Sequence, residues 1–139
     1  MVAPVPAGLK LIRAERLLEV RYADGTVYRL PAEYLRVYSP SAEVRGHGLA
    51  EPILVPGKRD VAIDQIVPVG RYAVRLAFSD GHDTGLFTWD ALWELGSEQA
   101  RLWLQYEARL AEHKMSRDRD LVKLSALQQP KLYVPKAPE

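Results

Sequence analysis

The stretch Leu17-Leu-Glu-Val-Arg-Tyr-Ala-Asp-Gly-Thr-Val-Tyr-Arg-Leu30 alternates apolar and polar side chains on both sides of an Ala-Asp-Gly turn. Alternation with a period of two is typical of half-buried strands, so the pattern predicts a β-hairpin. A three-residue loop, with its glycine in the left-handed conformation, pairs Val20 with Tyr28 in the core. Glu19 then lies opposite Arg29 on the outer face, whereas a two-residue loop would mix the two faces.

A second stretch, residues 71–86, repeats this alternation around the turn Ser79-Asp80-Gly81. The same three-residue loop predicts a second hairpin. Its expected pairs are Phe78–His82, Leu76–Thr84 and Val74–Leu86. This register places His82 on the inward face, at the mouth of the hairpin.

Shorter elements surround the two hairpins. A proline is expected to open a short helix over residues 31–36. An edge strand is expected near Leu9 and Leu11, and another from Val61 to Ile66.

After Trp89 the apolar period becomes that of a helix. Thr88 or Asp90 is expected to cap a short helix, and Gly96 is expected to end it. A longer helix is expected to continue to about Lys114. Its broad apolar stripe comprises Ala100, Trp103, Leu104, Ala108, Leu110 and Ala111.

Together these elements predict an α+β fold: a small antiparallel β-sheet built from hairpins, helices packed on one face, and a C-terminal helical extension. With 139 residues, 47% of them hydrophobic, the chain is long enough to bury a core. We expect an N-terminal tail at residues 1–8, a domain at 9–96, and a C-terminal helix and tail at 97–139.

The charges of the chain are nearly balanced, with a net charge of +1. This balance gives no reason to expect nucleic acid or a membrane surface as a partner. Arg21, Arg71 and Arg75 are expected to share an outer sheet face. Binding of single-stranded nucleic acid by that face is the weakest hypothesis, because it would need a more basic surface.

The absence of cysteine excludes disulfides, thiolate metal sites and cysteine nucleophiles from this chain. The first residues show neither the basic nor the apolar region of a signal peptide. No stretch approaches the roughly 18 apolar residues of a membrane span. We therefore expect a cytoplasmic protein.

The richest polar cluster is Asp80-Gly-His82-Asp83. Histidine flanked by carboxylates suits a metal site or proton transfer, and it also suits a turn whose aspartate binds its own backbone. An iron site of two histidines and one carboxylate needs a residue between the histidine and the carboxylate, but His82 and Asp83 are adjacent. We therefore expect neither a catalytic constellation nor a cofactor.

An aromatic-rich region comprises Phe87, Trp89, Trp93, Trp103 and Tyr106. Such side chains are expected to form core between helices and sheet. Two or three rings left exposed would instead mark a surface for a partner.

Four motifs stand out as a set: Asp24-Gly25, Leu30-Pro-Ala-Glu-Tyr-Leu-Arg36, Pro68-Val-Gly-Arg-Tyr72 and Asp80-Gly-His-Asp-Thr-Gly-Leu-Phe-Thr-Trp89. Over about residues 9–96 the chain resembles the gamma-butyrobetaine hydroxylase N-terminal-like family. The resemblance implies a small antiparallel sheet with helices. In the full-length dioxygenases this domain is an accessory unit with a structural zinc, and the catalytic iron lies in a separate domain, which we do not expect within these residues.

The implied zinc site departs from the family pattern. In the hydroxylases a Cys-x-Cys-x-x-Cys run follows the Leu-Arg motif, and a histidine of the later hairpin completes the site. Here Ser39, Ser41 and Val44 match the cysteines, and His82 matches the histidine. Serine and valine do not replace three thiolates, so no bound metal is expected.

Two functions remain open at this stage. The first is a non-catalytic accessory or protein-interaction module with an unknown protein partner. Related domains imply the iron–sulfur assembly machinery or a dioxygenase-type enzyme as the partner class, because one resembles the C-terminal part of a plastid iron–sulfur scaffold ATPase. The second is a metal- or small-ligand-binding protein centred on the His82 hairpin. The candidate binding residues are Arg36, Asp80, His82, Asp83, Trp89 and Trp93.

Overall fold

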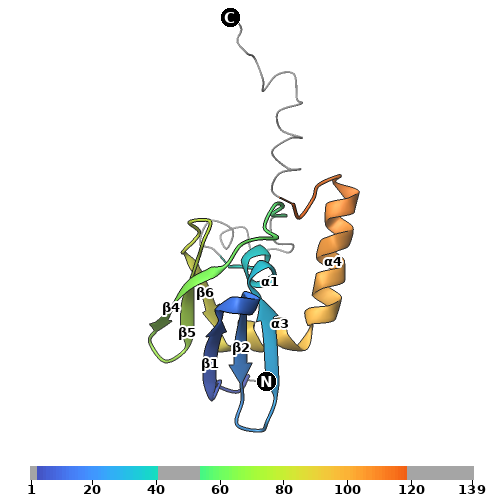
Figure 1. Ribbon diagram of the computed structural model, residues 1–139. Coiled ribbons are helices and arrows are strands. Elements are labelled where there is room, and N and C mark those ends of the chain that lie inside the picture. Colours follow the sequence, from blue (N-terminus) through green and yellow to red (C-terminus); the bar gives the residue numbers. More distant parts are fainter. Residues whose placement is uncertain (1–2, 41–53, 119–139) are drawn as a thin grey trace, which may run out of the picture.

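The computed structural model describes residues 3–40 and 54–118 (Figure 1). Two separate antiparallel sheets form its β part. Sheet A contains, in spatial order, β1 (Gly8–Ile12), β2 (Leu17–Arg21) and β3 (Val27–Pro31). Sheet B contains β4 (Ile63–Val69), β5 (Ala73–Phe78) and β6 (Gly85–Thr88). The helical elements are the 3-10 turn η1 (Arg13–Glu15) and the α-helices α1 (Ala32–Val37), α3 (Trp89–Ser97) and α4 (Gln99–Glu112).

The predicted α+β class is confirmed, with antiparallel hairpins, helices and a C-terminal helical extension. In Figure 1, α4 stands on one side of the molecule, opposite sheet B. Because the two hairpins lie in different sheets, Arg21 belongs to sheet A, whereas Arg75 belongs to sheet B and Arg71 lies in the turn between β4 and β5. The predicted shared arginine face is therefore wrong.

One continuous core joins both sheets to α1 and α3. Its largest fully buried side chains are Leu18, Val20, Leu30, Tyr34, Leu35, Ile63, Leu76, Phe87 and Leu92. Burial of this apolar surface is the main favourable term in folding.

The first hairpin has the predicted register, with Val20 opposite Tyr28 and Glu19 opposite Arg29. Gly25 adopts a φ of +94°, as the three-residue loop requires. Glu19 is only 5% exposed although it lies on the outer face. Its carboxylate accepts hydrogen bonds from Arg21 and Arg29, which cover it and lower its pKa.

The register of the second hairpin differs from the prediction by one residue. The turn is as expected, because the Phe78 amide donates to the His82 carbonyl. Beyond the turn, however, Leu76 pairs with Gly85 and Val74 with Phe87. The β6 side therefore holds one more residue than the β5 side. This shift buries the whole Phe87 side chain in place of Leu86, and the larger apolar group gains more from burial.

Helix α3 begins as predicted, since the Thr88 hydroxyl accepts a hydrogen bond from the Ala91 amide. The expected end at Gly96 is wrong, because α3 continues to Ser97. Gly96 is needed for a close approach instead: a Cβ placed on it would lie 2.1 Å from the Tyr28 ring. That ring is held edge-on between Tyr22 and Trp93.

Helix α4 runs close to its predicted length, but its apolar residues do not form one stripe. Trp103, Tyr106 and Leu110 pack against the rest of the protein. The other predicted members lie on an exposed face: Ala100, Leu104, Ala108 and Ala111. The sequence analysis therefore assigned residues of two different helix faces to one stripe. In the described part of the chain no helix is both long and apolar enough to cross a membrane.

The segment after α4 is tied back onto the domain. Arg117 makes two hydrogen bonds of 2.7 Å to the buried Glu33 carboxylate, and its guanidinium stacks over the Trp103 ring. The backbone amides of Gly57 and Arg59 also donate to carbonyls of residues 116–117. The ion pair between Arg117 and Glu33 joins residues that are 84 positions apart, and the sequence analysis did not predict it.

We expect Gly96→Ala to lower the free energy of unfolding by about 1–3 kcal/mol, because the new methyl group displaces the Tyr28 ring from its aromatic partners. In an open helix the same change would stabilise by about 1 kcal/mol. Urea unfolding followed by circular dichroism measures the difference. Gly8→Ala is the matched control, since nothing lies within 4 Å of a Cβ at that position. A Gly96→Ala protein as stable as wild type would contradict the close approach.

Candidate functional site

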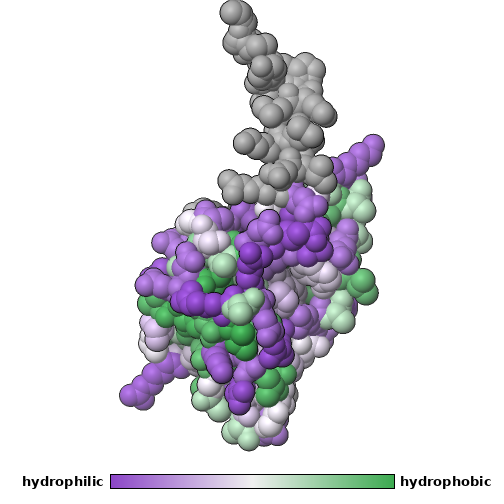
Figure 2. Space-filling view, in the orientation of Figure 1, coloured by the Kyte–Doolittle hydropathy of each residue, from purple (hydrophilic) through white to green (hydrophobic). Residues whose placement is uncertain are grey.

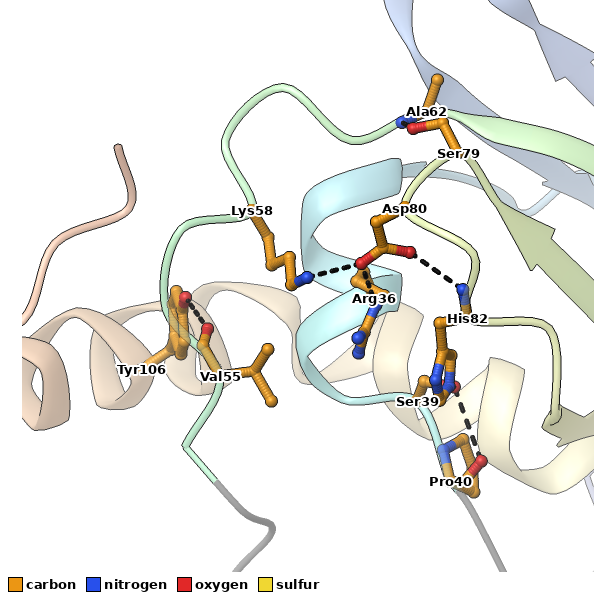
Figure 3. A network of polar contacts seen from close by, with 10 residues as sticks. All are labelled: Arg36, Ser39, Pro40, Val55, Lys58, Ala62, Ser79, Asp80, His82 and Tyr106. Atoms are coloured by element: carbon orange, nitrogen blue, oxygen red, sulfur yellow. Dashed lines mark hydrogen bonds and ion pairs between the residues drawn. The ribbon is translucent and has the colours of Figure 1, made fainter. Parts of the chain in front are cut away.

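The predicted polar cluster forms where three distant segments of the chain meet (Figure 3). Helix α1 contributes Arg36, the segment before β4 contributes Lys58, and the β5–β6 turn contributes Asp80 and His82. The turn has the local structure that its sequence predicts, because Gly81 adopts a φ of +92°.

Asp80 is the centre of this cluster. Its Oδ2 accepts hydrogen bonds from Arg36 Nε at 2.8 Å and from Lys58 Nζ at 2.5 Å. Its Oδ1 accepts from the backbone amide of His82 at 3.1 Å, which closes the turn. The Asp80 side chain is 21% exposed, so these ion pairs are only partly open to water.

The surroundings of Asp80 hold its carboxyl group in the charged form. Partial burial raises its pKa, but the hydrogen bonds from Lys58, Arg36 and the His82 amide outweigh that effect and lower the pKa to about 2. A carboxyl group with so low a pKa stays ionised throughout the physiological range. It is therefore a poor proton donor or acceptor at neutral pH.

His82 lies beside Phe78, as predicted, with ring centroids 6.0 Å apart. Its Nε2 is 3.0 Å from Ser39 Oγ, just beyond the C-terminal end of α1. Ser39 packs tightly against β6, because a Cβ on Gly85 would lie 1.9 Å from its hydroxyl oxygen. The imidazole is thus held by the hydroxyl of Ser39 and by an aromatic ring.

This arrangement bears on the implied zinc site. The fold brings together two of its matching positions, Ser39 and His82, while Ser41 and Val44 lie outside the described residues. A neutral hydroxyl and one imidazole do not fit zinc, which takes four thiolate, imidazole or carboxylate ligands in structural sites. Within residues 3–40 and 54–118, no group of three histidine or acidic side chains is placed to hold a metal ion.

A groove opens beside the cluster. Its volume is about 550 Å³. The lining residues are Pro56, Gly57, Lys58, Asp60, Val61, Ser79 and Asp80. Two members of the groove, Lys58 and Asp80, also belong to the ion-pair cluster, so the groove and the His82 turn form one continuous face, which we term the His82 face.

The other candidate residues are Asp83, which lies in the same turn as His82, and Trp89 and Trp93, which lie outside the His82 face. Asp83 follows His82 in the turn, but its backbone carbonyl, not its side chain, accepts the hydrogen bond from Arg75. Trp89 and Trp93 lie in α3, which begins at the opposite end of β6. The Trp89 indole donates to the Arg71 carbonyl, and Trp93 packs edge-on against Tyr22 and Tyr28.

Lys58 and Ser39 are site residues that the sequence analysis did not predict as contacts of the cluster. Lys58 lies 22 residues before Asp80, in a segment without regular periodicity. No local signal indicates such a pairing, because it depends on how α1 and sheet B pack. The position of Ser39 was indicated only by its match to a cysteine of the resembled family.

We expect Asp80→Asn to lower the free energy of unfolding by about 1–2 kcal/mol at neutral pH, less than the full pKa shift implies because solvent partly screens the pairs. The folded-state pKa of about 2 lies below the ordinary value of 3.8. The stabilisation is therefore complete above about pH 5 and is lost as the pH falls from about 4 to 2. Urea unfolding of wild type and variant across this range measures it. Asp83→Asn makes the same charge change in the same turn and should lower the free energy of unfolding far less. An equal decrease in the two variants would contradict the role of Asp80.

Comparisons with known proteins support one family assignment. The family model described as "Gamma-butyrobetaine hydroxylase-like, N-terminal" matches residues 9–93. No curated protein matches the chain. One solution structure solved by NMR is 46% identical to this chain, with a TM-score of 0.74, and covers 85% of this chain and 93% of its own. A second is 53% identical, with a TM-score of 0.72, and covers 82% of this chain and 85% of its own. A crystal structure from Acidithiobacillus ferrooxidans, of a DUF971 family protein with unknown function, is 41% identical, with a TM-score of 0.54, and covers 68% of this chain and 94% of its own. The chain therefore belongs to the gamma-butyrobetaine hydroxylase-like N-terminal family.

Proposed function

We propose that this protein is a non-catalytic accessory module that binds a protein partner through the His82 face. The observation that carries the proposal is the engagement of Asp80 by both Arg36 and Lys58 at the edge of an open groove. The proposed contact residues are Arg36, Lys58, Asp80, His82 and Asp83, with Trp89 and Trp93 as outlying candidates on α3.

The protonation state of the site favours binding over catalysis. A general acid or base works best with a pKa near the operating pH. The pKa of Asp80, at about 2, is far from that range, and His82 Nε2 lies within hydrogen-bonding distance of Ser39 Oγ. We therefore assign Asp80 the role of holding the face in one shape.

A face held in this way is suited to protein recognition. Its ion pairs connect α1, the segment before β4 and the β5–β6 turn, so little conformational freedom is left to lose on binding. Among the groove residues only Pro56 and Val61 carry sizeable apolar side chains. Small-molecule pockets are mostly apolar and enclosed, whereas a polar, open groove can receive side chains of a protein surface.

The partner classes follow from the family. The matching family model describes the N-terminal part of gamma-butyrobetaine hydroxylase-like proteins, so a dioxygenase-type enzyme is one candidate partner. The iron–sulfur assembly machinery is the other, through the related domain of a plastid scaffold ATPase. The proposal places the protein in the cytoplasm and requires neither nucleic acid nor a membrane.

The test is affinity capture from native lysate with wild type, His82→Ala and Lys58→Ala as baits. We expect a specific partner that wild type retains and that both variants lose, because each variant removes one element of the His82 face. Lys10→Ala, on an exposed position of β1, is the matched control and should retain the partner. Retention by all four baits would show that the interaction uses another surface, and a wild-type column without a specific partner would refute the proposal.

The second candidate is a small-ligand site in the same groove, favoured by its volume of about 550 Å³, which lies within the usual range of about 300–1,000 Å³ for ligand pockets. A ligand at 100 times its Kd stabilises the folded state by about 2.7 kcal/mol. A thermal-shift panel of small carboxylates and amines should then reveal a stabilising compound whose effect disappears in Asp80→Asn. Zinc serves as the metal arm of the panel. If no compound shifts the melting temperature of wild type, this candidate is wrong.

A further inference from the structure

Residues 116–118, shortly after α4, run back across the surface of the domain, and we term them the strap. The backbone carbonyls of Ser116 and Arg117 accept hydrogen bonds from the amides of Gly57 at 2.9 Å and Arg59 at 3.0 Å. Figure 1 shows this orange segment beside the green segment that precedes β4. Figure 2 shows mainly hydrophilic side chains where the two segments meet. The strap is therefore held by polar contacts at the surface.

A largely buried ion pair anchors the strap. The Glu33 side chain is 8% exposed, and both of its carboxylate oxygens accept hydrogen bonds of 2.7 Å from Arg117. The Arg117 guanidinium also lies 5.0 Å from the centre of the Trp103 ring on α4. A bidentate pair fixes orientation as well as position, and removal of either partner would leave the other charge buried without compensation. The strap therefore has one well-defined docking position.

The strap holds the backbone on both sides of Lys58. The amides that bind the strap belong to Gly57 and Arg59, the two sequence neighbours of Lys58. The Arg59 side chain adds an ion pair with Asp118. This part of the chain belongs to no helix or strand, so regular structure does not fix where Lys58 lies. The contact of 2.5 Å between Lys58 Nζ and Asp80 Oδ2 therefore depends on the docked strap.

The same anchor connects the two cations that bind Asp80. Arg36 lies in α1, three residues after Glu33, whereas Lys58 lies in the segment that the strap holds. The Glu33–Arg117 pair thus ties the helix that carries one cation to the segment that carries the other. Asp80 requires both cations in place at once, because its Oδ2 accepts hydrogen bonds from Arg36 Nε and from Lys58 Nζ.

We propose that Arg117 is a positioning residue for the His82 face: by docking the strap on Glu33, it places Lys58 against Asp80 and sets the shape of the groove. Arg117 itself does not line the groove. Four of the seven lining residues lie in the segment that the strap holds: Pro56, Gly57, Lys58 and Asp60. A partner bound at the groove would therefore depend on a residue that it does not touch. This consequence for binding rests on the proposed function, whereas the positioning of Lys58 does not.

Acylation of lysine side chains by an N-hydroxysuccinimide acetate, followed by mass spectrometry of peptides, tests the positioning at neutral pH. The reagent attacks the unpaired amine, so the ion pair with Asp80 should slow the reaction of Lys58. We expect Arg117→Ala to raise the rate at Lys58 by about two- to fivefold, the factor that a partly exposed ion pair provides. Loss of the Arg117 charge alone would keep Lys58 protonated and slow the reaction, so a faster rate indicates that Lys58 is released. Lys10, exposed on β1, is the internal control.

The double variant Glu33→Gln/Arg117→Gln removes both charges and leaves no unpaired buried charge, so it provides the same test if Arg117→Ala does not fold. A rate at Lys58 that stays at the wild-type value in a variant shown by circular dichroism to be folded would overturn the proposal.

Partner capture separates this inference from the proposed function. If wild type retains a specific partner, Arg117→Ala should retain about fivefold less of it, and Arg101→Ala, which removes an exposed arginine of α4, should retain it fully. Full retention by Arg117→Ala would overturn the control of binding by the strap. A wild-type column without a specific partner would refute the proposed function, whereas the acylation rate alone decides whether Arg117 positions Lys58.

Discussion

The Tyr34 hydroxyl donates a 2.6 Å hydrogen bond to the Leu95 carbonyl, and this buried contact joins helix α1 to the end of α3. A six-residue helix is too short to be stable alone, so α1 exists because its surroundings hold it. Five of its six residues are buried. Its polar side chains are therefore in positions where each needs a hydrogen-bonding partner, and the partners come from other parts of the chain.

These partners explain why the rest of the domain has its arrangement. From α1 and the two residues after it, side chains reach α3, α4, the β5–β6 turn and the segment after α4. The contacts are Glu33–Arg117, Tyr34–Leu95, Arg36–Asp80, Tyr38–Leu102 and Ser39–His82. Each contact satisfies a buried or half-buried polar group only if one particular segment docks in one place. Apolar packing supplies most of the stability, whereas these polar contacts select the arrangement.

What could be predicted from the sequence depends on whether a feature is local or requires contact between distant segments of the chain. The first hairpin was predicted with its full register, because turn geometry and alternation are local properties. The second was displaced by one residue, because Leu86 and Phe87 are both apolar and only the packing of the core selects Phe87. Gly96 looked like a helix end, but its role depends on the Tyr28 ring far away in the sequence. Within the candidate site, Asp80 and His82 were predicted together as neighbours, whereas Arg36 and Lys58 reach Asp80 across 44 and 22 residues.

The contact between Ser39 and His82 joins two positions that match zinc ligands in the resembled hydroxylases. The resemblance to the hydroxylases implies that a zinc ion ties this turn to the segment after α1, and structural zinc contributes directly to folding. Here the hydroxyl–imidazole contact of Ser39 with His82 and the ion pair of Arg36 with Asp80 join the turn to α1 and the residues after it. Each such contact is weaker than a coordinate bond, and several act together with the buried Phe78 and Phe87. The shape of the His82 face therefore depends on charge and packing among these residues.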